Sequence, residues 1–416
     1  MSNSSSEWRL RLRHGTGALA LALAMGGAAA GAWAQDALRP EVGKPLQAAQ
    51  ALIKTGKYRE ALAKVREAES AGAKTANESY MIERMRIAAA SGAGDVETAA
   101  KSYEVIASSG RGNAADKIRM VESIAGGYYR MREYAKAQQW AQRYFREGGT
   151  NPAIRTLLIQ SQYLAGDFAG AAKELTAEVR AAEKSGSAPG ENRLKLLLNA
   201  ATKLNDNNTY VYAVEKLVTY YPKKEYWVDL TSRMQRKQSF SDRLALDAYR
   251  LSLATGSMSA APDFMEMSQL ALQAEYPSEA KQIIDKGFAA GILGTGNEAE
   301  RHKRLRDLVL KKLDEAKAVR EQAEKDARAE KSGDALVRLG FELVHAGQSA
   351  RGLQLMQQGI AKGQLKRPDD AKLHLGIAQL MANETSKAQA TFKGVGGVDG
   401  TADLARLWSL HAKRRS

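Results

Sequence analysis

Apolar side chains recur at helical spacing on both sides of Gly56, near the start of the chain. Steps of three and four residues place these positions on one face of a helix, and Lys, Arg and Glu fall on the other face. Gly56 can adopt the left-handed conformation that ends a helix, so the segment predicts two antiparallel helices joined by a short turn. The apolar positions are Ala48, Ala49, Leu52 and Ile53 before the turn, and Tyr58, Ala61, Leu62, Val65 and Ala68 after it.

This pattern returns along the chain in steps of about 34 to 42 residues, or about twice that. A single helix hairpin cannot bury both of its faces, so the recurrence predicts a stack of copies. Each copy has a small residue in its second helix, where the two backbones approach closely. These small residues are Ala61, Ala99, Ala137, Ala171, Ala213, Ala280, Gly352 and Ala388, and the turn positions are Gly56, Gly94, Arg132, Gly166, Asn208, Gly347 and Asn383.

The run Gly56-Lys57-Tyr58, followed by Ala61, resembles the tetratricopeptide repeat (TPR), a helix–turn–helix unit of roughly 34 residues. The copies depart from the family's pattern, because Ile87 and Ile159 occupy positions where a small residue is typical and the usual tryptophan of the first helix is missing. The resemblance implies an all-α fold, a right-handed superhelix of stacked antiparallel helix pairs (an α-solenoid). It also implies contact with other proteins and not a reaction.

The N-terminus has the form of a bacterial secretory signal. Arg9, Arg11 and Arg13 precede an apolar run from Ala18 to Met25, and small residues then lead to Ala34. We expect cleavage after Ala34 and export to the periplasm, with an uncleaved anchor as the alternative. No cysteine follows the apolar run, so a lipoprotein is not expected.

The remaining chain is predicted to have four parts. A lead-in over 35–45 is followed by an N-terminal array over 46–295, a long charged helix over 296–333, and helix pairs with a capping helix over 334–416. The long helix is interpreted as a projecting arm or a bridge between arrays. Its thin apolar seam consists of Leu313, Ala316, Val319, Ala323 and Ala327.

The absence of cysteine and the positive net charge limit the reactions and the partners that are possible. The chain has no cysteine, which excludes disulfides, thiolate catalysis and cysteine-based metal sites. Its net charge is +15, and loss of the signal's three arginines and one glutamate leaves +13. In an exported protein this charge favours an anionic envelope surface or an acidic protein over nucleic acid, or it serves solubility alone.

Catalytic motifs are weak in this sequence. Ser278 and Lys281 match S-x-x-K and Lys54-Thr55-Gly56 matches K-T-G, but their order is the reverse of that in penicillin-binding enzymes. The histidines show no metal-binding spacing. We therefore expect neither an enzyme nor a cofactor or metal site.

The resemblance carries the candidate binding residues. In the family, the first helix of each pair lines the inner groove of the superhelix, which suits an extended peptide or a partner helix. The alternative is that Tyr129 and Tyr163 pack between repeats. The positions of this chain that match the family's groove-lining positions are Arg84, Glu122, Tyr129, Gln160, Tyr163 and Lys195.

A basic run and an aromatic run each allow a binding interpretation and a simpler structural one. The basic run Arg301–Arg306, with Lys311 and Lys312, fits an anionic surface or a solvated helix face. The aromatic run at Tyr220, Tyr221, Tyr226 and Trp227 fits sugar stacking or a filled helix junction. The sequence thus predicts a non-enzymatic periplasmic scaffold or adaptor in envelope complex assembly, with a glycan- or peptidoglycan-binding module as the alternative.

Overall fold

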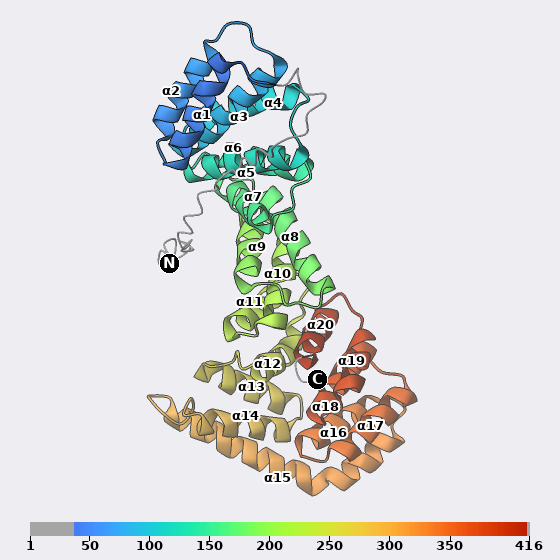
Figure 1. Ribbon diagram of the computed structural model, residues 1–416. Coiled ribbons are helices and arrows are strands. Elements are labelled where there is room, and N and C mark those ends of the chain that lie inside the picture. Colours follow the sequence, from blue (N-terminus) through green and yellow to red (C-terminus); the bar gives the residue numbers. More distant parts are fainter. Residues whose placement is uncertain (1–36, 414–416) are drawn as a thin grey trace. The chain divides into compact units, whose positions relative to one another are not determined.

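The computed structural model describes residues 37–413, and every regular element within them is a helix (Figure 1). The predicted signal peptide lies outside the described residues. The chain divides into two compact units between Glu174 and Leu175, within α8 (Phe168–Lys184). This boundary lies inside the predicted N-terminal array and matches none of the predicted boundaries. The four predicted parts stay predictions.

Unit 1, described over 37–174, is a succession of antiparallel helix pairs. Helix α1 begins at Pro40, inside the predicted lead-in, because proline is tolerated at the first position of a helix. Helices α1 and α2 share one apolar core with α3, and a second core extends from α3 to α7. The helices are α1 (Pro40–Lys54), α2 (Tyr58–Glu69), α3 (Ala76–Ala93), α4 (Val96–Ser108), α5 (Ala114–Arg130), α6 (Tyr134–Arg146) and α7 (Pro152–Leu164), followed by the first part of α8.

Unit 2 begins with the rest of α8 and has a large apolar core that extends from Val179 to Ala412, beside a smaller one where α15 meets α16 and α17. Its last helix packs against helices near its beginning, so the unit closes on itself (Figure 1). The helices are α9 (Glu191–Lys203), α10 (Asn207–Tyr220), α11 (Lys224–Gln235), a 3₁₀ helix (Asp242–Leu244), α12 (Ala245–Ala254), α13 (Ala261–Gln273), α14 (Pro277–Ala289), α15 (Ala299–Ala329), α16 (Asp334–His345), α17 (Ser349–Lys362), α18 (Pro368–Met381), α19 (Thr385–Lys393) and α20 (Thr401–Ala412).

The small residues that mark the repeats lie at helix contacts, as the sequence predicts. All seven alanines of that set are fully buried, and Gly352 is buried as well. A Cβ added to Gly352 would lie 2.5 Å from the carbonyl oxygen of Gly340, so α16 and α17 approach more closely than any side chain would allow. This spacing confirms the close-packing position and the all-α stack of antiparallel helix pairs.

Six of the seven predicted turn residues have positive φ, including Arg132 at 64° and Asn383 at 62°. The exception is Asn208, which lies inside α10. The left-handed residue there is Asn205, with φ of 54°, and Asp206 caps α10 by accepting from the backbone N–H of Thr209. Helix α10 therefore begins about one turn earlier than the repeat pattern predicts.

Helix α15 bridges two parts of unit 2. Its first half packs against α13 and α14 through Leu305 and Val309, and its end packs against α16 through Ala327. With 31 residues it is about 46 Å long. The seam prediction is wrong at Val319, which is 58% exposed, because Arg320 occupies the partly buried position there.

Ion pairs reinforce the closure of unit 2. Arg243, in the 3₁₀ helix, pairs with Asp370 of α18 and with Asp399, which precedes α20. Lys237 Nζ lies 2.7 Å from Asp403 of α20. No helix within 37–413 combines the length and apolar character needed to cross a membrane.

Candidate functional site

The six predicted groove residues lie on the first helices of successive pairs. Arg84 is on α3, Glu122 and Tyr129 are on α5, and Gln160 and Tyr163 are on α7. These five belong to unit 1 and are called the α3–α7 row below. Lys195 lies on α9, in unit 2, and pairs with Glu191 at 3.1 Å.

Members of the α3–α7 row connect each first helix to the next one. Arg84 lies 3.4 Å from Asp116 of α5, and Tyr129 donates its hydroxyl to Gln160 at 2.9 Å. The Nδ2 of Asn151, which caps α7, donates to Glu122 at 2.8 Å. Burial raises the pKa of Tyr129.

The two tyrosines of the row also contact the second helix of their own pair. Tyr129 packs edge-on against Tyr134, and Tyr163 does the same with Phe168 at 5.2 Å between ring centroids. Both side chains are half-buried, so packing between helices accounts for much of their surface while an edge stays exposed. A binding role for these residues stays a prediction.

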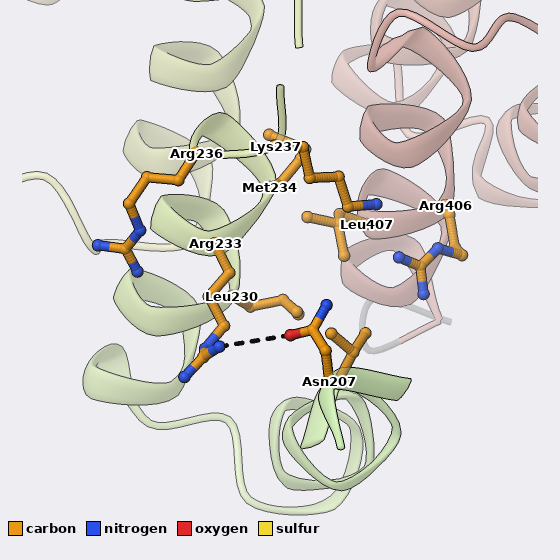
Figure 2. Close-up of a pocket in the computed structure, with 9 residues that line it drawn as sticks. Asn207, Leu230, Arg233, Met234, Arg236, Lys237, Arg406 and Leu407 are labelled. Carbon is orange, nitrogen blue, oxygen red and sulfur yellow. Dashed lines mark hydrogen bonds between the residues drawn. The ribbon is translucent and has the colours of Figure 1, made fainter. Parts of the chain in front are cut away.

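Unit 2 contains a cavity of about 260 Å³ between α10, α11 and α20 (Figure 2). Basic side chains and a buried apolar floor form its walls, and none of the lining residues is acidic. Figure 2 shows Asn207, Lys237 and Arg406 reaching toward the same space from different elements, while Arg236 points to the other side of α11. The lining residues are Asn207, Val211, Leu230, Arg233, Met234, Arg236, Lys237, Arg406 and Leu407.

Arg233 organises one wall of this cavity. Its guanidinium stacks 3.5 Å from the centroid of the Tyr210 ring, and its Nε donates to Asp229 at 3.1 Å. Its Nη1 reaches the side-chain oxygen of Asn207 at 3.5 Å (Figure 2). Because that oxygen faces Arg233, the amide group of Asn207 is left as a donor toward the cavity.

A cluster of buried charged groups lies where α12, α14, α16 and α18 meet. The guanidinium of Arg250 donates to both carboxylate oxygens of Glu279, at 2.6 and 2.7 Å, and to Asp247 at 2.7 Å. His374 lies 2.9 Å from Asp247, and His345 lies 3.8 Å from Glu279. Arg250, Asp247 and Glu279 are each at most 6% exposed, so the pairing compensates for their removal from water.

The surroundings shift the pKa values of this cluster in opposite directions. Burial outweighs the nearby charges at His345 and lowers its pKa to about 4. Burial also raises the pKa of Glu342 to about 7, although the backbone N–H of Ser278 donates to its carboxylate at 3.0 Å. At Glu279 the guanidinium of Arg250 overcomes burial and lowers the pKa. The cluster holds four helices together.

Sequence patterns alone did not identify the cavity or the cluster. The one local signal is that Asp247 and Arg250 interrupt an apolar helix at a spacing of three residues, which places both on one face. Their remaining partners are 29 to 127 residues away in the sequence.

The basic run on α15 forms mostly local ion pairs. Lys303 pairs with Glu300 at 2.7 Å and Arg301 pairs with Glu298 at 3.3 Å, both within one helical turn. His302 is buried and accepts from the backbone N–H of Gly294 at 3.1 Å. This arrangement favours a solvated helix face over a free basic patch.

The aromatic run fills a helix junction. Trp227 is fully buried, Tyr226 donates to Glu191 at 2.5 Å, and Tyr221 donates to the backbone oxygen of Pro189 at 2.8 Å. The rings of Trp227 and Tyr226 are buried and offer no platform to a sugar, whereas Tyr221 is only partly buried. The S-x-x-K residues are equally engaged, since Ser278 is buried and Lys281 pairs with Asp285.

No protein-family model and no curated protein matches the chain. Among solved structures, it is similar to the TPR2AB domain of yeast Sti1 in its complex with pHSP90, at 12% identity and a TM-score of 0.23, over 72% of this chain and 99% of that one. It is also similar to yeast Tom70, at 11% identity and a TM-score of 0.25, over 90% and 96% of the two chains.

A third similar structure is the pentatricopeptide repeat protein PPR10 from maize, at 13% identity and a TM-score of 0.29, over 87% of this chain and 61% of that one. Antiparallel pairs, positive-φ turns and buried small residues at fixed positions make the present chain an all-α, TPR-like array.

Proposed function

We propose that the protein is an exported, non-enzymatic scaffold that binds another protein in the periplasm and acts in the assembly of an envelope complex. The observation that carries this proposal is the α3–α7 row, in which Arg84 contacts α5 and Tyr129 contacts Gln160 of α7, so that polar side chains connect three successive first helices. Arginine, tyrosine and amide groups on a rigid helical surface suit the recognition of an extended peptide or a partner helix. The N-terminal signal pattern supports export.

Arg119 offers a direct test of this surface. It lies on α5 one turn before Glu122 and two to three turns before Tyr129, and half of its side chain is exposed. Exposed arginines are frequent anchors of protein interfaces, and truncation of such an anchor typically costs tenfold or more in affinity, about 1.4 kcal/mol. Its loss should cost the fold little, because the buried carboxylate of Asp116 keeps two other partners, Arg84 at 3.4 Å and the Nδ2 of Asn113 at 3.1 Å.

The experiment is chemical crosslinking in intact cells, followed by purification of the chain and mass spectrometry. We expect a discrete protein partner with the native chain, and its loss with Arg119→Ala. The matched control is Gln139→Ala, because Gln139 is an exposed residue on α6, a second helix. Recovery of glycan or lipid without any protein would contradict the scaffold and favour the glycan-binding alternative.

Export is tested separately. We expect the chain in the periplasmic fraction, with an N-terminus that begins at Gln35. An N-terminus at Met1 in the membrane fraction would indicate an uncleaved anchor, and a cytoplasmic chain would exclude export.

A further inference from the structure

We propose that the cavity between α10, α11 and α20 binds the free carboxylate at the end of a polypeptide whose last side chain is apolar. This inference rests on the proposed function, because it gives the chemistry of one partner segment. It concerns unit 2 and is separate from the α3–α7 row, so either surface can be correct without the other.

Hydrogen-bond donors converge on the cavity. The ammonium group of Lys237 donates one hydrogen bond to Asp403, at 2.7 Å. Its other two N–H groups are left for a ligand. Arg233 holds the oxygen of Asn207, so the amide N–H groups of Asn207 face the same space (Figure 2). Arg406 supplies a guanidinium from α20. Two oxygens of one carboxylate can accept from these three side chains together.

Acidic partners balance the basic side chains that face the cavity, and this balance limits the charge of a ligand. Each basic side chain that faces it has an acidic partner outside the lining: Asp229 for Arg233, Asp403 for Lys237, and both Glu215 and Asp403 for Arg406. These acids orient the cations and cancel most of their charge. A dianionic phosphate would need a stronger positive potential than remains, whereas a monoanionic carboxylate does not.

The floor of the cavity is apolar. Leu230, Met234 and Leu407 lie beneath the basic rim, and each is at most 4% exposed. A volume of about 260 Å³ is below the range of roughly 300 to 1,000 Å³ that holds a drug-sized molecule. It therefore fits one terminal residue, with the side chain on the floor and the carboxylate at the rim, and it is too small for a lipid chain.

The test is fluorescence anisotropy with the full chain and a labelled hexapeptide that ends in Ser-Leu with a free carboxylate. The matched probe is the same peptide with a C-terminal amide, which removes the charge and one acceptor. We expect saturable binding of the free acid and at least about tenfold weaker binding of the amide, because a hydrogen bond to a charged group is typically worth that factor.

Lys237→Met removes one of the converging donors and should weaken binding of the free acid about tenfold. Lys303→Met is the control, because Lys303 is also an exposed lysine of unit 2 with one acidic partner at 2.7 Å. Circular dichroism and thermal unfolding should be native-like for both variants, since each loses only an exposed ion pair.

Three results would overturn the proposal: no saturable binding of the free acid up to about 1 mM, which is the weak end of specific affinity; equal binding of acid and amide; or an equal loss in both lysine variants, which would indicate general charge attraction. If partner crosslinking persists in Lys237→Met while the peptide result is negative, the carboxylate site fails and the proposed scaffold function stands.

Discussion

Arg250 is the residue on which the centre of unit 2 depends. Its guanidinium is 4% exposed and bridges Asp247 of its own helix to Glu279 of α14, and it also lies over the rings of Tyr276 and Phe341. Such a buried network contributes little net free energy when it is intact, but removing one member leaves uncompensated charge in a low dielectric.

Arg250→Met should therefore lower the free energy of unfolding by about 3 to 5 kcal/mol, because Glu279 and Asp247 would stay buried without their cation. Denaturant titration followed by circular dichroism measures this loss. The control is Arg304→Met, an exposed arginine of α15 that should change stability by less than about 0.5 kcal/mol. Equal effects of the two variants would contradict a structural role for the cluster.

Glu342 should make stability depend on pH in a particular direction. Burial raises its pKa from 4.5 to about 7, so the folded chain holds a proton that the unfolded chain has lost between these two values. Its contribution to stability is thus fully present below about pH 4.5 and is lost as the pH rises through about 7. His345, with a pKa lowered to about 4, contributes the opposite slope below pH 6.5.

Glu342→Gln separates these two effects, because glutamine stays neutral and can still accept from the backbone N–H of Ser278. The free energy of unfolding of the variant, relative to the native chain, should rise by about 2 kcal/mol between pH 5 and pH 8. A difference that is constant with pH would contradict the raised pKa.

At the scale of elements, the contact of α16 and α17 depends on glycine. A Cβ on Gly352 would lie 2.5 Å from the carbonyl oxygen of Gly340, and a Cβ on Gly340 would lie 2.5 Å from the carbonyl oxygen of Gly352. Gly352→Ala should therefore destabilise the protein by about 1 to 3 kcal/mol, since backbone must move apart to admit the methyl group.

Gly126→Ala is the matched substitution, because Gly126 lies inside α5 and a Cβ there meets only the end of the Arg130 side chain, at 3.4 Å. Alanine is the better helix former by roughly 0.5 to 1 kcal/mol, so this variant should be neutral or slightly more stable. Thermal unfolding measures both variants. A stable Gly352→Ala protein would show that the two helices do not need their close approach.

The elements were predictable where local chemistry decides them. Small residues at the close-packing positions and left-handed turn residues follow from sequence, and the structure confirms both at most positions. The seam of α15 was not predictable at Val319, because the buried positions follow the spacing of Leu313, Ala316, Arg320, Ala323 and Ala327. An arginine can bury its aliphatic stem there and keep its charge in water, which hydrophobicity alone does not reveal.

The candidate sites were less predictable than the fold. The family resemblance placed six residues on successive first helices, but the hydrogen bonds between such residues depend on the register between helices, as between Tyr129 and Gln160. The cavity at Asn207, Lys237 and Arg406 exists only because α20 packs against α10, some 200 residues earlier in the chain. No local pattern encodes that closure.

At the scale of the whole molecule, the chain consists of two compact units with separate apolar cores. We expect scanning calorimetry to resolve two unfolding transitions, because each unit has apolar cores of its own that can unfold separately. Arg250→Met should lower only the transition of unit 2. One transition that shifts as a whole in this variant would show that the two units unfold together.

The two units differ in how much of their helix surface is available to a partner of the proposed scaffold. In unit 2, α20 packs against α10 and α12, and α16 packs against α14, so these contacts bury part of the array's own surface. In unit 1, first helices follow one another through α3, α5 and α7 and carry the α3–α7 row. Binding of another protein is therefore best tested at the α3–α7 row.

The most direct measurement is site-specific photo-crosslinking in living cells, with a photoreactive amino acid in place of Arg119 on α5 and, in a separate strain, in place of Gln139 on α6. Both positions are exposed. We expect light to produce one discrete protein adduct at position 119 and none at position 139. Adducts of equal yield at both positions, or an adduct at 119 that contains no protein, would contradict this expectation.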